Sequence, residues 1–287
     1  MPPIPIGKTN LHYRQWLRLL RSAGRKRSNL FLIEGEREVL RALAAKVPFE
    51  AIILSETALS AGKEKLLSDA LPPNILQAKE FHFYVLSDAL FRTLSLREHP
   101  DGVLAVAKRF ERSCETLRLN PNGLYLLTEG LEKPGNLGAL LRSAEAVAID
   151  ALLLADPQTD VFNPNVIRAS QGAVFEVKIY TDTSERFLER IRASGLPLYA
   201  ATPRATRSFW ECDFTKGGVF CIGNEARGLS DFWIKEATAI KIPMYGQSAD
   251  SLNAAVAGTL LLYEARRQQT ALFLKNRVGA LLYGGIG

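Results

Sequence analysis

A glycine-containing segment, residues 128–138, carries polar side chains at a spacing that suits ligand binding. Asn136 lies near its end, and Arg142 follows six residues later. If a helix begins in this segment, six residues rise about 9 Å, so both side chains could flank one site at the helix start. Backbone N–H groups at a helix start are also free to bind a ligand. The alternative interpretation is a helix-capping asparagine followed by a surface arginine.

Two later segments have a similar composition. Residues 222–230 place Glu225 between two glycines, where its carboxylate could contact a polar ligand. Residues 242–253 end with Ser251 and Asn253, and Ser251 is a natural N-cap for a helix over the residues that follow. Each segment could also be a surface turn that leads into a helix cap, so the pattern alone leaves both interpretations open.

Several common chemistries lack their residue patterns in this chain. The glycines at 130 and 135 have the spacing of a phosphate-binding loop, but the Lys and the Ser or Thr that complete it are absent. Neither a G-x-G-x-x-G after a strand nor a G-x-S-x-G occurs, which disfavours a nicotinamide dehydrogenase and a serine hydrolase. The three cysteines and three histidines are scattered. We therefore expect no disulfide framework and a metal-free site.

The positive charge is concentrated near the N-terminus. The net charge is +6, and residues 1–120 carry 19 Lys and Arg against 13 Asp and Glu, whereas residues 121–287 carry 17 of each. The spacing of the first arginines predicts one face of a single helix, formed by Arg14, Arg18, Arg21 and Arg25 and followed by Lys26 and Arg27. Such a face is typical of proteins that bind nucleic-acid phosphates. A solvated basic helix with its leucines packed inward is the alternative.

Apolar runs in the first part of the chain predict a small α/β unit. We expect strands over 30–33, 51–54 and 102–107, helices over 36–45 and 63–71, and more helix than strand over 81–94. Polar residues that end in Asn-Pro-Asn-Gly indicate a linker. The predicted division is a first domain over 1–112, a linker over 113–123, a second domain over 124–270 and a tail over 271–287.

Strands and helices alternate regularly in the second domain. We expect strands over 124–127, 151–155, 174–179, 197–201, 219–222 and 239–242, and helices over 137–147, 165–171, 184–193, 231–237 and 251–268. Near-continuous apolar strands alternating with helices predict a parallel sheet that is covered on both faces. Such sheets bind ligands at the carboxyl ends of their strands. Each of the three polar segments follows a predicted strand and is therefore placed for chemistry.

Length and composition agree with this organisation. A chain of 287 residues suggests two domains, and 47% hydrophobic with 23% charged residues is an ordinary globular balance. Apolar runs stay well below the roughly 18 residues of a membrane helix. The first ten residues lack the apolar core of a secretory signal. We expect a cytoplasmic protein.

Together, the three polar segments resemble the signature motifs of the SpoU-like RNA ribose 2′-O-methyltransferases, the TrmH-type enzymes of the SPOUT class. Residues 136–142 match N-x-G-x-x-x-R, residues 223–229 match G-x-E-x-x-G-L, and residues 242–253 match I-P-M-x-G-x-x-x-x-S-L-N without a gap. The motifs occur in the family's order. The resemblance covers residues 124–268.

The N-terminal part resembles the ribosomal-protein-like RNA-binding domain that many of these enzymes carry. The matching stretches are residues 31–35, which precede a predicted helix, and residues 101–106. The resemblance implies that this domain binds the substrate RNA, and the residues we expect to do so are Arg14, Arg18, Arg21, Arg25, Lys26, Arg27 and Glu34.

The resemblance also implies a fold, a cofactor and a reaction. The α/β methyltransferase domain would contain a deep trefoil knot, bind S-adenosylmethionine and form a homodimer with the active site at the subunit interface. The reaction would be 2′-O-methylation of a ribose in ribosomal RNA, which the attached N-terminal domain favours over transfer RNA, and large-subunit RNA is the expected target. Transfer RNA as the substrate is one alternative. A catalytically idle RNA-binding or ribosome assembly protein is another.

By the same resemblance, Arg142 is the central catalytic residue. Because a guanidinium normally stays protonated, we favour a clamp on the adjacent phosphate over a general base. Asn136 would orient Arg142 or the ribose, and Glu225, Ser251 and Asn253 would complete the polar site. The residues expected to bind the cofactor are Thr202, Gly223, Asn224, Ile242, Met244 and Leu252.

Overall fold

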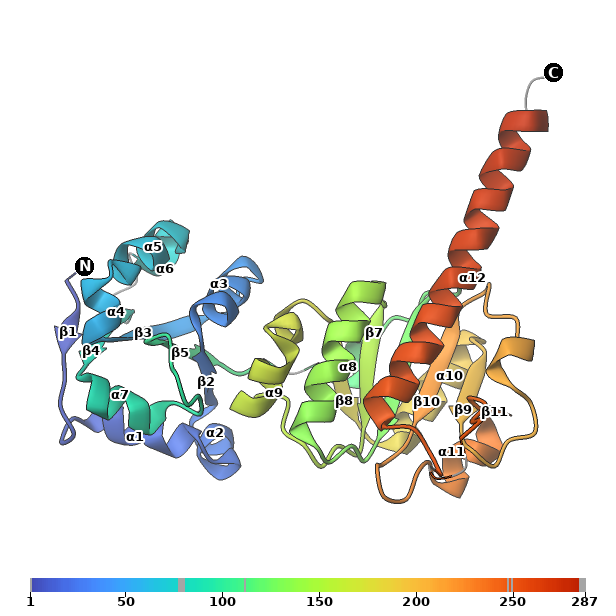
Figure 1. Cartoon of the computed structure of the whole chain (residues 1–287), viewed down its shortest axis with the longest axis horizontal. Helices are drawn as coiled ribbons and strands as arrows, with labels where there is room; N and C mark the ends of the chain where they lie inside the picture. The colour runs from blue at the N-terminus through green and yellow to red at the C-terminus, as the bar shows by residue number, and fades with distance from the viewer. Residues whose placement is uncertain (1, 77–80, 111, 247, 249, 284–287) are drawn as a thin grey trace. The chain divides into compact units, whose positions relative to one another are not determined.

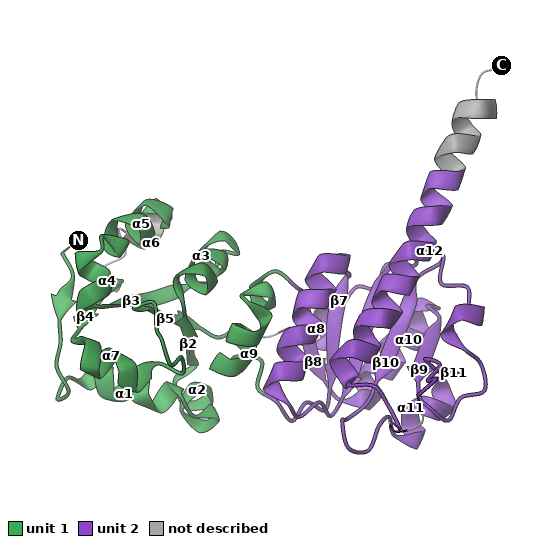
Figure 2. Ribbon diagram, viewed as in Figure 1, with its two compact units in different colours: residues 1–110, 160–176 green, residues 111–159, 177–287 purple. Residues whose placement is uncertain are grey.

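The computed structural model describes residues 2–76, 81–110, 112–246, 248 and 250–283, which form two compact units (Figure 2). Unit 1 comprises residues 1–110 and 160–176, and unit 2 comprises residues 111–159 and 177–287. Within the described residues, no helix combines the length and the apolar character that crossing a bilayer requires.

Unit 1 is built around a mixed sheet with the strand order β1-β4-β3-β5-β2. β1, β4 and β3 are parallel, whereas β5 runs antiparallel to β3 and β2. The strands are β1 (Ile4–Pro5), β2 (Leu30–Glu34), β3 (Phe49–Ser55), β4 (His82–Leu86) and β5 (Val103–Lys108). The helices are α1 (Leu11–Leu19), α2 (Ser22–Ser28), α3 (Glu36–Ala44), α4 (Glu56–Ser60), α5 (Lys63–Ala70), α6 (Pro73–Leu76), α7 (Asp88–Leu94) and α9 (Pro164–Ser170).

The basic N-terminal segment forms two helices rather than the single helix predicted. α1 ends at Leu19 and α2 begins at Ser22, because Arg21 has an extended backbone with φ −103° and ψ 141°. The chain turns tightly at this break. A Cβ atom on Gly24 would lie only 2.0 Å from the carbonyl oxygen of Arg18, so a larger residue at position 24 would force the turn open.

Residues 160–176, which include α9, belong to unit 1 although they lie between β7 and β8 of unit 2 in the sequence. The ring of Phe162 lies 4.6 Å from that of Phe31 in β2. Asp160 forms an ion pair with Arg25 at 2.7 Å. This placement differs from the predicted division, which assigned the segment to the second domain because its strand–helix pattern continues that of its neighbours.

Unit 2 is built around a fully parallel six-stranded sheet with the order β11-β9-β10-β6-β7-β8. The strands are β6 (Leu124–Glu129), β7 (Ala151–Ala155), β8 (Ile179–Asp182), β9 (Leu198–Ala201), β10 (Gly218–Ile222) and β11 (Thr238–Ile240). The helices are α8 (Pro134–Val147), α10 (Ser184–Ser194), α11 (Asp231–Glu236) and α12 (Ala254–Tyr283). α8 and α12 cover one face, and α10 and α11 the other (Figure 1). The predicted parallel α/β architecture is confirmed.

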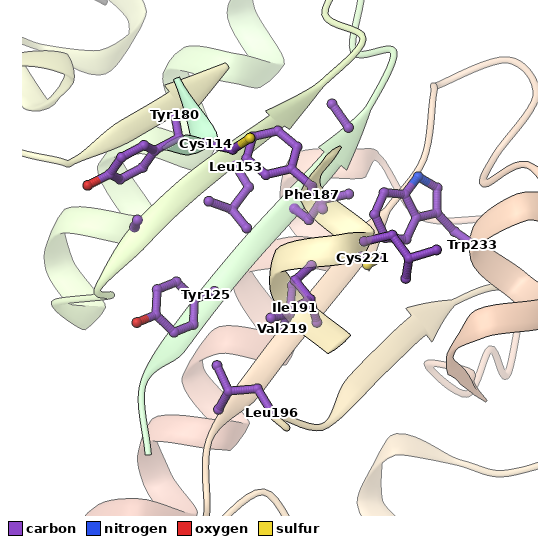
Figure 3. Close-up of a cluster of buried hydrophobic side chains, with 14 of the residues drawn as sticks. Cys114, Tyr125, Leu153, Tyr180, Phe187, Ile191, Leu196, Val219, Cys221 and Trp233 are labelled. Atoms are coloured by element: carbon purple, nitrogen blue, oxygen red, sulfur yellow. The ribbon is translucent and has the colours of Figure 1, made fainter. Parts of the chain in front are cut away.

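Apolar side chains hold the helices of unit 2 against both faces of its sheet. Figure 3 shows the cluster under α10 and α11, which includes Tyr125, Leu153, Phe187, Ile191, Val219, Cys221 and Trp233. On the opposite face, α12 approaches the sheet closely at Gly258. A Cβ atom there would lie 2.7 Å from Cδ2 of Leu140 and 3.2 Å from Cδ1 of Ile222. This close approach brings the start of α12 next to α8.

Two predicted elements have a different structure. Residues 81–94 form β4 and then α7, because Ser87 accepts a hydrogen bond from the backbone N–H of Leu90 and so caps a new helix where the strand ends. Residues 174–178 are not a strand. A short 3₁₀ helix, Ala173–Phe175, lies at the end of the unit 1 segment, and β8 of unit 2 pairs with β7 only from Ile179 onward.

The predicted linker and tail also differ from the structure. Cys114 and Leu117 are buried in the core of unit 2, so residues 113–123 are packed rather than a free linker. α12 begins at Ala254 instead of residue 251 and continues to Tyr283, through most of the predicted tail. Residues 284–287 lie outside the described residues.

Candidate active site

The candidate site lies where the strand order of the six-stranded sheet reverses. β7 and β8 follow β6 on one side, whereas β9 and β11 lie beyond β10 on the other. β6 and β10 are neighbours in the sheet, so the segments that follow them leave the same edge next to each other. Open parallel sheets bind ligands at this kind of position.

Glu225, in the segment after β10, binds the start of α8. Its Oε1 accepts hydrogen bonds from Nδ2 of Asn136 at 2.7 Å and from the backbone N–H of Lys133 at 3.2 Å. Its Oε2 accepts one from the backbone N–H of Glu132 at 3.3 Å. The carboxylate therefore lies at the positive end of the α8 dipole and occupies N–H groups that a helix start leaves unpaired.

The same contacts set the protonation state of Glu225. Partial burial raises the pKa of this carboxyl, but the hydrogen bonds from backbone N–H groups and from Asn136 outweigh that effect and hold the pKa below its usual range. Glu225 is therefore an anion at neutral pH. A carboxylate that accepts several fixed hydrogen bonds is a poor general base, because protonation would break them.

Asn136 and Asn253 extend this connection to α12. Nδ2 of Asn253 donates to Oδ1 of Asn136 at 3.0 Å, and Oδ1 of Asn253 accepts from the backbone N–H of Ala255 at 2.8 Å. Asn253, rather than the expected Ser251, is thus the residue that caps α12. The three side chains form a continuous polar relay, Glu225–Asn136–Asn253, that joins the three motif segments.

Asn224 and Glu129 hold the segments after β6 and β10 together. Nδ2 of Asn224 donates to the carbonyl oxygen of Gly130 and to the carboxylate of Glu132, both at 2.9 Å. The carboxylate of Glu129 accepts hydrogen bonds from the backbone N–H and the hydroxyl of Ser230 at 2.8 and 2.6 Å. Ser230 therefore contacts β6 instead of capping α11 through its side chain.

A cavity of about 570 Å³ opens beside this relay, lined by the segments that follow β9, β10 and β11. Every residue expected to bind the cofactor lines it, namely Thr202, Gly223, Asn224, Ile242, Met244 and Leu252. Glu225, Ser251 and Asn253 line it as well. Residues 247 and 249 of the third motif lie outside the described residues. The mixture of apolar side chains with backbone polar groups is typical of a site for a small organic molecule.

Arg142 stands apart from the relay. It lies two turns into α8, is exposed, and does not line the cavity. Among the described residues it has no hydrogen-bond or ion-pair partner. Asn136 is bonded to Glu225 and Asn253, so the expectation that Asn136 orients Arg142 is not met by a contact between them. The Arg142 guanidinium is free to bind an anion.

Other cavity residues were missed by sequence reasoning. Pro203 and Arg204 follow β9, Arg227 lies in the second motif segment, and Lys133 precedes α8. The rule that ligands bind after the carboxyl ends of parallel strands could have identified Pro203 and Arg204, since the segment follows a correctly predicted strand. Lys133 had no distinguishing pattern of its own.

The expected RNA-binding residues of unit 1 are of two kinds. Exposed on α1, α2 or the break between them are Arg14, Arg18, Arg21, Lys26 and Arg27. Arg25 is a correction, because only 2% of it is exposed and its guanidinium binds Asp160 and the carbonyl oxygens of Leu19 and Leu20. The break between α1 and α2 turns this side chain inward.

Glu34 is a second correction. It is buried at the end of β2, where its carboxylate accepts hydrogen bonds from the hydroxyl of Ser95 and, at 2.9 Å, from the backbone N–H of Leu96. It therefore holds the loop after α7 and is not available to RNA. Across the residues that the structure describes, no cluster of His, Cys, Asp and Glu could hold a metal ion.

The chain is similar along most of its length to known RNA methyltransferases. Residues 123–263 match the model of the SpoU rRNA Methylase family, and residues 10–105 match that of the MRM3-like substrate binding domain. The chain is 29% identical over 260 residues to the 23S rRNA (guanosine(2553)-2′-O)-methyltransferase RlmP of Bacillus subtilis, an alignment that covers 90% of this chain and 96% of that protein.

Solved structures extend the similarity to the whole fold. The crystal structure of an RNA 2′-O ribose methyltransferase is 38% identical, with a TM-score of 0.78, and the match covers 94% of this chain and 100% of that one. The SpoU methyltransferase AviRb from Streptomyces viridochromogenes, in complex with the cofactor AdoMet, is 28% identical with a TM-score of 0.78. That match covers 91% of this chain and 98% of AviRb.

Proposed function

Because the chain belongs to the SpoU rRNA methylase family, we propose that it methylates a ribose 2′-oxygen in large-subunit ribosomal RNA, using S-adenosylmethionine. The observation that carries the proposal is the Glu225–Asn136–Asn253 relay, which joins the three motif segments beside one cavity. A 2′-oxygen is absent from DNA, so this chemistry requires RNA. We also propose that the protein acts in the cytoplasm, where it would meet this RNA.

The cavity fits the cofactor in size and chemistry. Its volume lies within the range of about 300–1,000 Å³ of small-molecule sites. Apolar lining residues such as Ile242 and Leu252 suit an adenine ring, and backbone groups around Gly223 suit its polar atoms. When bound, S-adenosylmethionine supplies an electrophilic methyl group. The residues proposed to hold it are Thr202, Gly223, Asn224, Ile242, Met244 and Leu252.

Arg142 is the residue proposed to act on the RNA. Its guanidinium stays protonated at neutral pH, so it would bind the phosphate next to the target ribose and stabilise negative charge on the 2′-oxygen. A phosphate oxygen or a water molecule would take the hydroxyl proton. In this in-line displacement the 2′-oxygen would form a bond to the methyl carbon as the carbon–sulfur bond breaks, and S-adenosylhomocysteine would leave. Alignment of the 2′-oxygen is therefore the main requirement. For Glu225, Asn136 and Asn253 we propose a positioning role, because all three are committed to one another.

Unit 1 is proposed to bind the RNA outside the reacting nucleotide. Its match to a substrate binding domain and the exposed cations of α1 and α2 support this role. These cations would bind phosphates without reading sequence. The residues proposed are Arg14, Arg18, Arg21, Lys26 and Arg27.

We also propose that the active form is a homodimer and that each unit 2 contains a trefoil knot. α12 has an exposed apolar stripe of Val256, Leu260 and Tyr263, whose spacing places them on one helix face. Exposed apolar stripes of this kind are typical of helix–helix contacts between subunits. A second copy of α12 would cover this stripe.

The proposed function is tested by methyl transfer. The purified protein is incubated with S-adenosylmethionine that carries a radiolabelled methyl group and with separate pools of unmodified ribosomal and transfer RNA. We expect label in large-subunit RNA at a site that resists alkaline cleavage, and label lower by about 100-fold or more with Arg142→Ala. Label found only in transfer RNA would show that transfer RNA, and not ribosomal RNA, is the substrate. If neither RNA pool is labelled, the incubation is repeated with ribosome assembly intermediates. If these also stay unlabelled although the protein binds the cofactor, the protein is an idle RNA-binding protein.

A further inference from the structure

Exposed cations and aromatic rings lie on two segments that contribute residues to the cavity wall, and these side chains have no role in the proposed reaction. They belong to residues 203–210, which follow β9, and residues 241–245, which follow β11. We call these two segments the cation–aromatic strip. Its exposed side chains are Arg204, Arg207, Trp210 and Tyr245, and Lys241 is half-buried.

Backbone hydrogen bonds join the two segments of the strip. The N–H of Lys241 donates to the carbonyl oxygen of Arg207, and the N–H of Phe209 donates to the carbonyl oxygen of Lys241, both at 2.9 Å. One step closer to the sheet, the N–H of Thr202 donates to the carbonyl oxygen of Ile240, also at 2.9 Å. The strip is therefore a continuation of the β9–β11 pairing rather than a loose loop.

A capping box holds Trp210 in place on the strip. The Ser208 hydroxyl accepts from the backbone N–H of Trp210 at 3.2 Å, and the Glu211 carboxylate accepts from the backbone N–H of Ser208 at 3.0 Å. Phe209 points into the core and is buried, whereas 58% of Trp210 remains exposed. The ring is thus presented to solvent by a fixed backbone.

The strip borders the cavity on both of its segments. Thr202 and Arg204 line the cavity from the β9 side, and Ile242 and Met244 line it from the β11 side. Tyr245 directly follows Met244 and is 83% exposed. A polymer bound along the strip would therefore reach the mouth of the cavity.

The charges on the strip are available to a ligand. Among the described residues, no ion pair involves Arg204, Arg207 or Lys241. The nearest acidic residues in sequence are committed elsewhere, since Glu211 closes the capping box and Asp213 binds the Thr215 hydroxyl at 2.6 Å. The Arg207 side chain hydrogen-bonds the neutral Cys212 thiol. Within the described part of the chain, the strip therefore combines cations that lack an acidic partner with exposed aromatic rings.

We propose that the cation–aromatic strip binds a single-stranded segment of RNA and leads it to the cavity. Bases would stack on Trp210 and Tyr245, and Arg204 and Arg207 would bind the phosphates between them. Aromatic platforms next to cations suit unpaired strands, because a duplex keeps its base faces stacked within the helix. This inference rests on the proposed function, since it supplies the path by which the target nucleotide arrives.

Tryptophan fluorescence of the full-length protein gives a direct readout of the stacking. Trp16 and Trp233 are buried, with 2% and 0% exposed, so a bound base would quench mainly Trp210. The probes are a single-stranded RNA of about 12 nucleotides and the same sequence as a duplex. We expect quenching by the single strand and little by the duplex. The variant Trp210→Phe should keep the affinity within about threefold and lose the quenching, because phenylalanine still stacks.

Alanine variants test the contribution of the strip to affinity. Trp210→Ala combined with Tyr245→Ala should weaken single-strand binding about tenfold or more. The double variant Arg204→Ala, Arg207→Ala should bind with a weaker salt dependence. The slope of a plot of log K against log salt concentration should become shallower by about 1.4, because two phosphate contacts are lost. The matched control is Arg190→Ala with Lys216→Ala, which removes two exposed cations elsewhere in unit 2. If the control variant loses as much RNA affinity as the Arg204→Ala, Arg207→Ala variant, the proposal is overturned, because the loss would then reflect total charge and not the strip.

Two further outcomes would contradict RNA binding by the strip and leave the proposed function unaffected. If Trp210→Ala changes the sedimenting mass, the surface is a subunit contact. If ribosomal RNA is methylated and the alanine variants bind single strands as well as the unchanged protein does, the strand takes another path. The opposite result, quenching by single-stranded RNA but no methyl transfer to any RNA, would support the strip and contradict the proposed function.

Discussion

The side chains of Glu225 and Asn136, which are 89 residues apart in sequence, are joined by a hydrogen bond of 2.7 Å. The bond connects the segment after β10 to the first turn of α8. Through Asn253 the same connection reaches the start of α12. One half-buried carboxylate thus determines how three loops meet at the cavity.

Replacement of Glu225 by glutamine should loosen this junction. The neutral amide offers one acceptor oxygen in place of two charged ones, so at least one backbone N–H at the start of α8 loses its partner. Hydrogen bonds to charged groups contribute about 1.5–3 kcal/mol, and we expect a loss of about that size in the free energy of unfolding of unit 2. Urea unfolding monitored by circular dichroism measures it. An unchanged midpoint would show that the contacts of Glu225 are dispensable.

The depressed pKa of Glu225 makes its contribution depend on pH. The folded-state pKa lies below the ordinary value of 4.5, so the stabilisation is fully present above that value and is lost as the pH falls through the folded-state pKa. The stability difference between the wild type and Glu225→Gln should therefore be constant from pH 7 to about 5 and shrink below about pH 4.5. A stability difference between the two proteins that grows as the pH falls would contradict the conclusion that Glu225 stabilises the fold as an anion.

Asn253 and Ser251 make a matched pair for testing the cap of α12. Asn253→Ala removes the side chain that accepts from the N–H of Ala255 and should cost about 1 kcal/mol, together with weaker cofactor binding. Ser251→Ala removes a hydroxyl that makes no cap contact and should change stability by less than about 0.5 kcal/mol. Calorimetric titration with S-adenosylmethionine and thermal unfolding of both variants separate the two effects. Equal destabilisation by the two would refute the assigned cap.

Arg142→Ala should separate chemistry from folding. The side chain is exposed and unpartnered among the described residues, so its loss should leave thermal unfolding and cofactor affinity unchanged. Methyl transfer should fall about 100-fold or more, since removal of one preorganised donor costs roughly that much. Arg142→Lys should restore part of the rate, because it keeps the charge but not the planar fork. A variant that loses cofactor binding in parallel would place Arg142 in the cofactor site instead.

The buried ion pair of unit 1 predicts that replacing Arg25 and replacing Arg18 have different effects on stability and on RNA binding. Arg25→Ala removes the 2.7 Å partner of Asp160, which keeps a longer ion pair of 3.5 Å with Arg109, and it also frees two carbonyl oxygens that Arg25 binds. Because a second cation remains beside Asp160, we expect a loss of about 3 kcal/mol in the stability of unit 1, at the lower end of the range for a broken buried pair. Arg18→Ala removes an exposed cation and should leave stability within about 0.5 kcal/mol while weakening RNA binding at low salt. Unfolding curves and RNA titrations of both variants make the comparison. A stable Arg25→Ala protein with weak RNA binding would restore Arg25 to the RNA surface.

Local patterns determined the elements and the composition of the site. The apolar strands after residue 124, the helices between them and the polar segments that follow three strands are all encoded within short stretches of sequence. Because the strands are parallel, their carboxyl ends had to meet at one edge. The segments that carry Glu225, Asn136 and Asn253 could therefore be expected at the same edge of the sheet, but only the resemblance to a known family joined the three residues into one predicted site.

Long-range packing decided the rest. Nothing near Arg25 in sequence shows that Asp160 neutralises it, because the two are brought together only when residues 160–176 pack against β2. Tertiary contacts likewise committed Glu34 to the loop after α7 and made Asn253, rather than Ser251, the cap of α12. The role of a side chain depends on which partner contacts it in the folded protein. Sequence spacing predicts such contacts only within a helix turn or along a strand.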